Sequence, residues 1–175
     1  VVGTLIDFET GILDSVRRIG GRAAQGLSDD RIFEVYKRGR DAHPYRSSEA
    51  MFHVYKSLAQ ELELPADDLA AGAFQLDVLR WPAFADSAEA LRRLRRRFRL
   101  VAMTNADRTA FSSYANTLGQ PFDDSVTADE TGTAKPDPNF FSFNRGRQSA
   151  FGYKFGEILH VAQSQHHDIG VARKL

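Results

Sequence analysis

The strongest constraint on the fold is an alternation of short strand-like runs with helical stretches, confined to the second half of the chain. Three runs have the length and composition of buried strands: RLVAMT at 99–104, DSVTA at 124–128 and EILHVAQ at 157–163. Strands that alternate with helices form βα units, whose strands run parallel in one sheet. A further run, VVGTLI at 1–6, also has the composition of a strand. We therefore expect an α/β fold with a Rossmann-like parallel sheet.

Residues 11–80, by contrast, contain no convincing strand and are expected to be all-helical. One helix face is marked by apolar residues at helical spacing, namely Met51, Val54, Tyr55, Leu58 and Leu62. Ser47 and Ser48 precede this helix as a cap signal, Pro65 ends it, and Asp67 or Asp68 starts the next. The block separates the strand at 1–6 from the others. The simplest architecture is a helical cap, 11–80, inserted into an α/β core made of 1–10 and 81–175.

The segment that follows the cap is predicted to be an amphipathic helix rich in arginine. Asp86 and Glu89 have capping-box spacing, and Leu91, Leu94 and Phe98 form an apolar stripe. The arginines of this segment are Arg92, Arg93, Arg95, Arg96 and Arg97. Lys plus Arg and Asp plus Glu number 23 each, so no overall field favours nucleic acid or an anionic membrane. We interpret the arginines as a solvated helix face.

Composition excludes several function classes. The chain has no cysteine, which rules out disulfides, thiolate metal sites and a cysteine nucleophile and is typical of a reducing compartment. No apolar run approaches the roughly 20 residues that span a bilayer, and no targeting segment is visible. We expect a cytoplasmic protein with a small-molecule substrate and with neither nucleic acid nor membrane as partner.

Polar residues follow the predicted strands, where reactive groups gather in doubly wound sheets. The segments are Gly3-Thr4-Leu5, Thr104-Asn105, Lys135-Pro136-Asp137-Pro138, and Gln163-Ser164-Gln165 with Asp168 beyond. A hydroxyl, an amide, a lysine and a carboxylate could converge on one anionic centre. Each also has a structural explanation: Thr104-Asn105 as a helix cap, Lys135 as an exposed loop residue, and Asp168 as the cap of the last helix.

In order and spacing these segments resemble the four motifs of the haloacid dehalogenase-like (HAD) hydrolase superfamily, over nearly the whole chain. The first motif is a nucleophilic aspartate, two variable residues and Gly-Thr-Leu. A Ser or Thr, a Lys and an acidic cluster make the other three. Here VVGTLIDFETGILD, VAMTNAD, TAKPDP and HVAQSQHHDIGVA stand in that order.

The resemblance leaves two registers for the first motif. Aligning Gly3-Thr4 with it places the nucleophile immediately before Val1. The alternative makes Asp7 the nucleophile, but Thr10 and Gly11 then stand in reverse order and the Gly-Thr-Leu string is unexplained. We favour the first register and expect Asp7 and Glu9 to begin the first cap helix, where acidic residues stabilise the helix dipole.

Two departures separate the chain from the phosphatases of the superfamily. Those enzymes resemble one another in a second aspartate that acts as general acid and base, and Val2 stands at that position. They hold Mg²⁺ with an acidic cluster whose first acid corresponds to Gln163, which leaves Asp168. The resemblance thus implies the L-2-haloacid dehalogenase branch, which hydrolyses small 2-haloacids through an aspartyl ester without a metal or other cofactor.

The same resemblance implies the site residues. Lys135 would keep the nucleophile ionised, Asp168 would orient or activate the hydrolytic water, and Thr4 would position the nucleophile. Binding roles fall on Thr104, Asn105, Gln165 and a cap arginine, with Arg38, Arg40 and Arg46 as candidates and Arg38 favoured by position. Relatives are often homodimers, which makes a homodimer possible here.

Other readings stay open. Phe141 stands where many dehalogenases have Tyr, and Gln163 and Gln165 replace smaller residues, so the substrate is undetermined. A Mg²⁺-dependent HAD phosphatase using Asp7 and Asp168, and a catalytically silent HAD-like binding domain, are the two alternative function classes. His160, His166, His167 and Asp168 suggest a metal site, but adjacent histidines on a helix point in different directions. We expect Phe140, Phe141 and Phe143 to bury a helix face and Trp81 to pack at the hinge.

Overall fold

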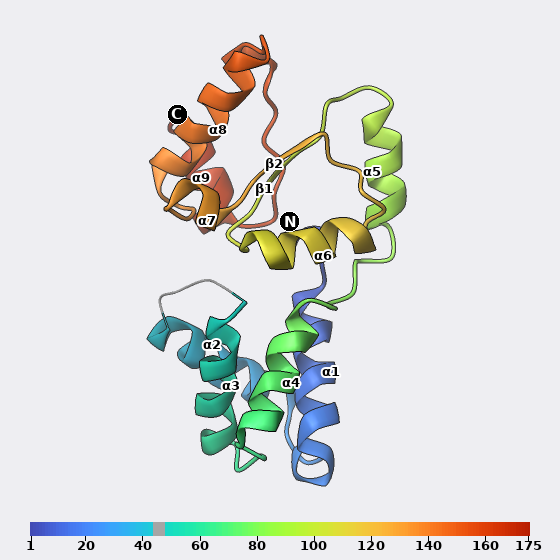
Figure 1. Ribbon diagram of the computed structural model, residues 1–175, viewed down its shortest axis with the longest axis vertical. Helices are drawn as coiled ribbons and strands as arrows, with labels where there is room; N and C mark the ends of the chain where they lie inside the picture. Colours follow the sequence, from blue (N-terminus) through green and yellow to red (C-terminus); the bar gives the residue numbers. More distant parts are fainter. Residues whose placement is uncertain (44–47) are drawn as a thin grey trace.

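The computed structural model describes residues 1–43 and 48–175, with a helical part below and a strand-containing part above (Figure 1). The helical part consists of α1 (Phe8–Gly20), a 3-10 turn (Gly21–Ala24), α2 (Asp29–Ala42), α3 (Ala50–Glu61) and α4 (Asp68–Val78). Helix α3 packs against α2 and α4, and α1 packs against α4. The helical character expected of 11–80 is thus confirmed for its described residues, while the exact domain boundaries stay a prediction.

Local signals set the helices of this part. The predicted face of α3 is buried at all five positions, Met51, Val54, Tyr55, Leu58 and Leu62. The Oδ1 atom of Asp67 accepts a hydrogen bond from the Ala70 amide at 2.8 Å, so Asp67 caps α4. Asp7 caps α1 in the same way, as expected. The predicted serine cap of α3 is wrong for Ser48, because Glu49 is the N-cap. Ser47 lies outside the described residues.

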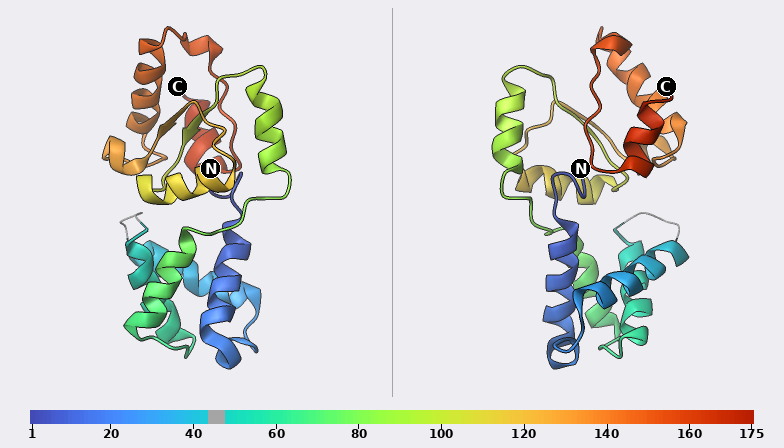
Figure 2. Two further views of the ribbon diagram at one scale, coloured as in Figure 1. Left: turned by 45° about the vertical axis from the view of Figure 1, so that its right-hand side comes forward. Right: turned by 180° about the vertical axis from the view of Figure 1, so that it is seen from behind.

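The strand-containing part alternates strands and helices. Its elements are α5 (Ser87–Arg95), β1 (Val101–Met103), α6 (Arg108–Thr117), β2 (Asp124–Val126), α7 (Ala128–Thr131), α8 (Pro138–Ala150), a 3-10 turn η2 (Phe155–Glu157), a π-helical turn η3 (Gln165–Ile169) and α9 (Gly170–Ala172). Strands β1 and β2 pair in parallel, with Ala102 opposite Ser125. Helices α5 and α8 lie on opposite sides of the strand pair (Figures 1 and 2). This confirms the α/β class with parallel strands.

Two of the predicted strands are wrong. Residues 1–6 form a turn, in which Gly3 has a φ of 78° and the Leu5 amide donates to the Val1 carbonyl at 2.8 Å. Residues 158–163 have no regular structure, and Leu159 and Val161 are 79% and 73% exposed. A strand needs a neighbour to pair its backbone groups, and in the described part of the chain no strand pairs with 158–163. The apolar composition of both segments was therefore misleading.

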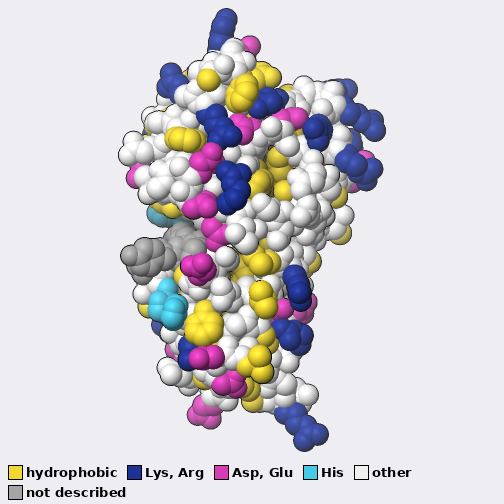
Figure 3. Space-filling model, viewed as in Figure 1, with side chains coloured by type: hydrophobic (Ala, Val, Ile, Leu, Met, Phe, Trp, Pro, Cys, Tyr) yellow, Lys and Arg dark blue, Asp and Glu magenta, His cyan; other side chains and the backbone are white. Residues whose placement is uncertain are grey.

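The arginine-rich helix α5 is only partly as predicted. Asp86 is the N-cap but its side chain accepts no cap hydrogen bond, so the capping box is wrong. Leu91 is buried, whereas Leu94 is exposed within the helix and Phe98 is exposed beyond its end at Arg95. All five arginines are exposed, and Figure 3 shows Lys and Arg gathered over α5. Arg92 pairs with Glu89, and Arg95 with Asp123, as on a solvated face.

Trp81 packs where the chain passes between the two parts. The Asp7 amide donates to the Pro82 carbonyl at 2.8 Å, so the two crossings lie side by side. The buried Trp81 ring stacks on Tyr114 of α6, with ring centroids 6.3 Å apart. A Cβ atom on Gly11 would lie 2.1 Å from Trp81 Cδ1, so glycine is required there. Phe140 and Phe141 are buried as expected, but Phe143 is exposed. No helix in the described residues is long and apolar enough to cross a membrane.

Candidate functional site

A buried ion pair lies at the carboxyl end of β1. The Nζ atom of Lys135 donates to Oδ1 of Asp168 at 2.6 Å and to the carbonyl oxygen of Met103, the last residue of β1, at 3.1 Å. Both charged side chains are almost fully buried, with exposed fractions of 6% and 7%. A buried charge is stable only when it is paired and hydrogen-bonded, and here each charge meets both conditions. The structural explanations of Lys135 as an exposed loop residue and of Asp168 as a helix cap therefore do not hold.

Asn105 fixes the loop that carries the lysine. Its Nδ2 atom donates to the Lys135 carbonyl at 2.8 Å, and its Oδ1 atom accepts from the Lys135 amide, also at 2.8 Å. Thr104 is buried, and its hydroxyl accepts from the Ala106 amide at 3.2 Å. Asp107, and not Thr104 or Asn105, caps α6. The amide of Asn105 is thus committed to positioning Lys135.

Asp168 is held in its ionised form. Burial by itself disfavours the charge and raises the pKa, but hydrogen bonds from His160 and Lys135 outweigh it and lower the pKa of Asp168 to about 2. The His160 bond joins Nε2 to the same Oδ1 atom at 2.9 Å. Because an ionised carboxylate can only accept, Nε2 of His160 carries the proton in this contact.

The amino-terminal turn lies against this pair. The Val1 nitrogen is buried and lies within electrostatic range of both Lys135 and Asp168. Thr4 Oγ1 accepts a hydrogen bond from the Gln163 amide at 3.2 Å, which joins the turn to the segment that leads to Asp168. Thr4, Thr104, Asn105, Lys135 and Asp168 therefore surround one region.

Two predicted binding residues lie apart from this cluster. Arg38 is on the exposed side of α2, where its guanidinium pairs with Glu34 and Glu61. Gln165 is exposed at the start of the π-helical turn, and its side chain makes no hydrogen bond within the described residues. Arg40 differs from Arg38: it is half-buried, contacts Met51, and its charge acts on Tyr114 in the strand-containing part. Arg46 lies outside the described residues.

His160 is the member of the cluster that the sequence did not assign. The apolar run around it predicted a strand, and its chemistry suggested only a metal site with His166 and His167. The rings of those two pack on each other with centroids 4.9 Å apart, and Nδ1 of His167 is 3.2 Å from the Ser164 hydroxyl. A histidine eight residues before a motif carboxylate was the available signal, but nothing local showed that the chain folds back there.

The donor set does not fit a hard divalent cation. Oδ1 of Asp168 already accepts from Lys135 and His160, and the neighbouring Gln163 brings no charge. In the described ranges no group of three or more His, Cys, Asp or Glu side chains is placed to hold a metal ion. Mg²⁺ needs several oxygen ligands, and the described cluster offers it a single carboxylate, with Oδ2 of Asp168 as the free oxygen.

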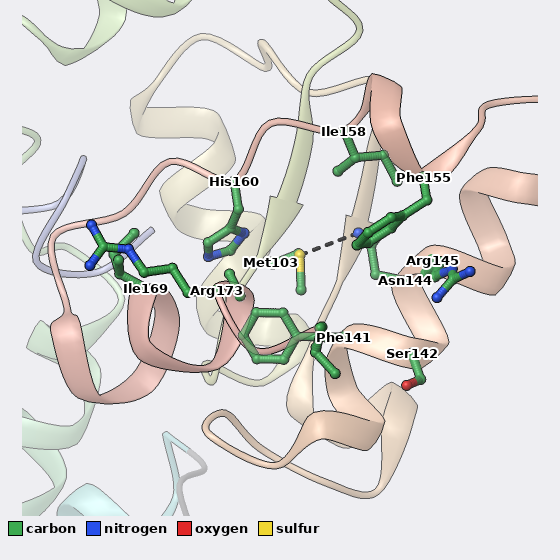
Figure 4. Close-up of a pocket in the computed structure, with 12 residues that line it drawn as sticks. Met103, Phe141, Ser142, Asn144, Arg145, Phe155, Ile158, His160, Ile169 and Arg173 are labelled. Atoms are coloured by element: carbon green, nitrogen blue, oxygen red, sulfur yellow. Dashed lines mark hydrogen bonds between the residues drawn. The ribbon is translucent and has the colours of Figure 1, made fainter.

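A cavity of about 430 Å³ adjoins the cluster (Figure 4). Its wall is mostly apolar, with Met103, Phe141, Phe155, Ile158 and Ile169, and it includes Arg145, Arg173 and His160. The His160 ring meets Phe141 at an angle of 60°, with centroids 5.4 Å apart. Phe141, which stands where many dehalogenases have Tyr, therefore packs against His160 in this chain.

Comparison with known proteins identifies the fold. The sequence model of the haloacid dehalogenase-like hydrolase family matches residues 1–169 of this chain. The HAD hydrolase YfnB from Bacillus subtilis, whose structure was determined bound to magnesium, has a TM-score of 0.79 at 18% identity, covering 99% of this chain and 82% of that one. The L-2-haloacid dehalogenase PA0810 has a TM-score of 0.78 at 22% identity, covering 100% and 78%.

The L-2-haloacid dehalogenase from Xanthobacter autotrophicus is a further similar structure. Its TM-score is 0.73 at 18% identity, and the alignment covers 99% of this chain and 71% of that one. No match was found among curated protein sequences. At these identities the structural similarity establishes the fold and leaves the substrate to be decided by the site.

Proposed function

The chain belongs to the haloacid dehalogenase-like hydrolase family, and on that basis we propose that it hydrolyses the carbon–halogen bond of small 2-haloacids without a metal ion. The observation that carries the proposal is the buried pair of Lys135 and Asp168, together with the neutral Gln163 five residues before Asp168 in the sequence. This arrangement provides one cation and one carboxylate for a reaction at carbon. The fold shared with two L-2-haloacid dehalogenases agrees with it.

The proposed reaction has two steps. The motif register assigns the nucleophile to an aspartate bonded to the Val1 nitrogen, beside Lys135 and Asp168. Its carboxylate oxygen attacks C2 of the haloacid, and the halide leaves with the electron pair of the carbon–halogen bond, which yields an ester. Water then adds to the ester carbonyl carbon, and its proton passes through Asp168 to the oxygen of the departing 2-hydroxy acid. The carboxylate is regenerated.

Each residue of the cluster has a task in this scheme. Lys135 keeps the nucleophile ionised through its nearby positive charge, and Asn105 holds the Lys135 backbone in place. Thr4 positions the nucleophile, and Thr104 binds the substrate carboxylate. The pairing of Arg38 with Glu34 and Glu61 favours Arg40 for contact with the leaving halide. We assign Gln165 a supporting role through contacts that form only when substrate is bound.

A Mg²⁺-dependent phosphatase is the second candidate, because YfnB was crystallised with magnesium and shares the fold. Val2 offers no proton-transfer group, and the oxygen of Asp168 that meets Lys135 also meets His160. These residues favour dehalogenation over phosphoryl transfer.

The test is halide release by protein expressed from the complete gene. A panel of 2-chloro, 2-bromo and 2-fluoro acids is incubated with and without a chelator, and free halide is measured by ion chromatography. We expect release that is unchanged by the chelator and lost in Asp168→Asn, with Asp68→Asn as the matched control at an exposed carboxylate. Phosphate release from a generic ester that requires Mg²⁺, with no halide release, would refute the proposal.

A further inference from the structure

We infer that His160 is a positioning residue that sets the orientation of the Asp168 carboxylate for water activation. The inference rests on the proposed function, because it concerns the second step of that reaction. It starts from one contact, the 2.9 Å hydrogen bond between His160 Nε2 and Asp168 Oδ1.

Two donors converge on one carboxylate oxygen. Lys135 reaches Oδ1 from the loop between α7 and α8 at 2.6 Å, and His160 reaches it from the irregular segment that follows η2 at 2.9 Å. A single donor leaves a carboxylate free to rotate about that bond, whereas two donors from different elements fix its plane. Oδ2 is then the oxygen left to accept a proton from water.

The His160 ring is itself fixed from outside the cluster. Its side chain is 18% exposed, and Phe141 of α8 packs edge-on against it. Figure 4 shows the ring directed from its segment toward the region of Met103 and Phe141. Its neighbours Leu159 and Val161 are strongly exposed, so burial of these side chains does not hold the segment. A side chain so constrained in a loosely packed segment fits a role toward Asp168 better than a role in packing.

The inference predicts which step slows. General-base catalysis contributes about 10²–10⁴-fold to a rate, and a misoriented base loses part of it. His160→Phe keeps an aromatic ring against Phe141 but removes the donor. We expect the first halide to be released at the normal rate, in an amount equal to the enzyme present, followed by turnover about ten- to a hundred-fold slower. KM should not rise, and the ester should accumulate as a covalent adduct in the intact-protein mass spectrum.

Two further variants separate positioning from packing. His160→Gln places an amide donor at similar reach, and we expect it to restore turnover to within a few-fold of the wild type. His166→Phe is the matched control, because it makes the same chemical change at an exposed residue two positions before Asp168. It should leave both phases of halide release unchanged. Should His160→Phe not fold, His160→Leu removes the donor with a smaller side chain.

The outcomes are distinguishable by stopped-flow halide measurement. A wild type that releases no halide overturns the proposed function. A wild type that turns over, with a donor-less variant that shows no burst, overturns the inference alone. Failure of His160→Gln to recover more than His160→Phe also overturns it, since a structural role would not depend on the donor.

Discussion

Two ion pairs of the same length show how the two parts of the molecule differ. Lys56 and Asp68 in the helical part, like Lys135 and Asp168 in the strand-containing part, join Nζ to Oδ1 over 2.6 Å. The first pair is 36% and 80% exposed, and the second 6% and 7%. Exposed pairs contribute roughly 0–1 kcal/mol, whereas removal of one partner from a buried pair costs about 3–5 kcal/mol. Surroundings, and not bond length, decide the energetic weight.

The same contrast extends to what each part buries. The helical part buries apolar side chains, among them Val54, Tyr55, Leu58 and Phe74, each with no exposed surface. The polar side chains buried in the described residues of the strand-containing part are Ser87, Thr104, Ser125, Thr127, Lys135, Asn144, Gln148 and Asp168. Buried polar groups need their partners and contribute less to stability than apolar packing does. The helical part is therefore stabilised chiefly by apolar packing, whereas the strand-containing part holds its reactive groups at a cost in stability.

The largest effect is expected from Lys135→Met. Turnover of a 2-haloacid should fall by at least about a thousand-fold because the nucleophile loses its cation, and the free energy of unfolding should fall by about 3–5 kcal/mol because Asp168 stays buried and unpaired. Lys56→Met makes the same change at the exposed pair and should alter stability by about 1 kcal/mol or less and leave turnover unchanged. Urea unfolding and halide release measure the two effects.

A double variant sharpens that result. Lys135→Met combined with Asp168→Leu removes both charges, so it should recover stability toward the wild type while turnover stays lost. Equal stability losses for Lys135→Met and Lys56→Met would show that burial does not distinguish the pairs.

The next effect concerns packing in α4. Phe74→Ala should lower the free energy of unfolding by about 3–5 kcal/mol, because Phe74 is fully buried beside Tyr55. Leu69→Ala in the same helix is the control, since Leu69 is 85% exposed, and it should change stability by about 0.5 kcal/mol or less. Turnover per folded molecule should be unchanged in both. A thousand-fold loss of activity in folded Phe74→Ala would contradict the separation of roles.

The smallest effect is expected from Asp7→Ala. Loss of the α1 cap should cost about 1 kcal/mol, and kcat should stay within two-fold of the wild type. Asp67→Ala, which removes the corresponding cap of α4, should behave alike. Thermal melts and halide release check both. Abolished turnover in Asp7→Ala alone would move the nucleophile to Asp7 and reverse the preferred motif register.

Sequence reasoning predicted the helices better than the strands. The buried face of α3 and the Asp67 cap follow from interactions between residues three or four positions apart. The strands expected at 1–6 and 157–163 failed because strand pairing depends on residues distant along the chain. In the site, motif order indicated Lys135, Asp168, Thr104 and Asn105. It did not indicate His160, and it favoured Arg38 before its partners Glu34 and Glu61 were known.

The sequence by itself determined the helical block, the α/β class and the family, because these depend on local periodicity and on the order of motifs along the chain. Tertiary structure alone decided that Asn105 clamps the Lys135 backbone, that Lys135 and Asp168 are buried together, and that His160 shares their oxygen. Those contacts join residues 30, 33 and 8 positions apart, and only the folded chain brings such groups to hydrogen-bonding distance and removes the water that would screen them.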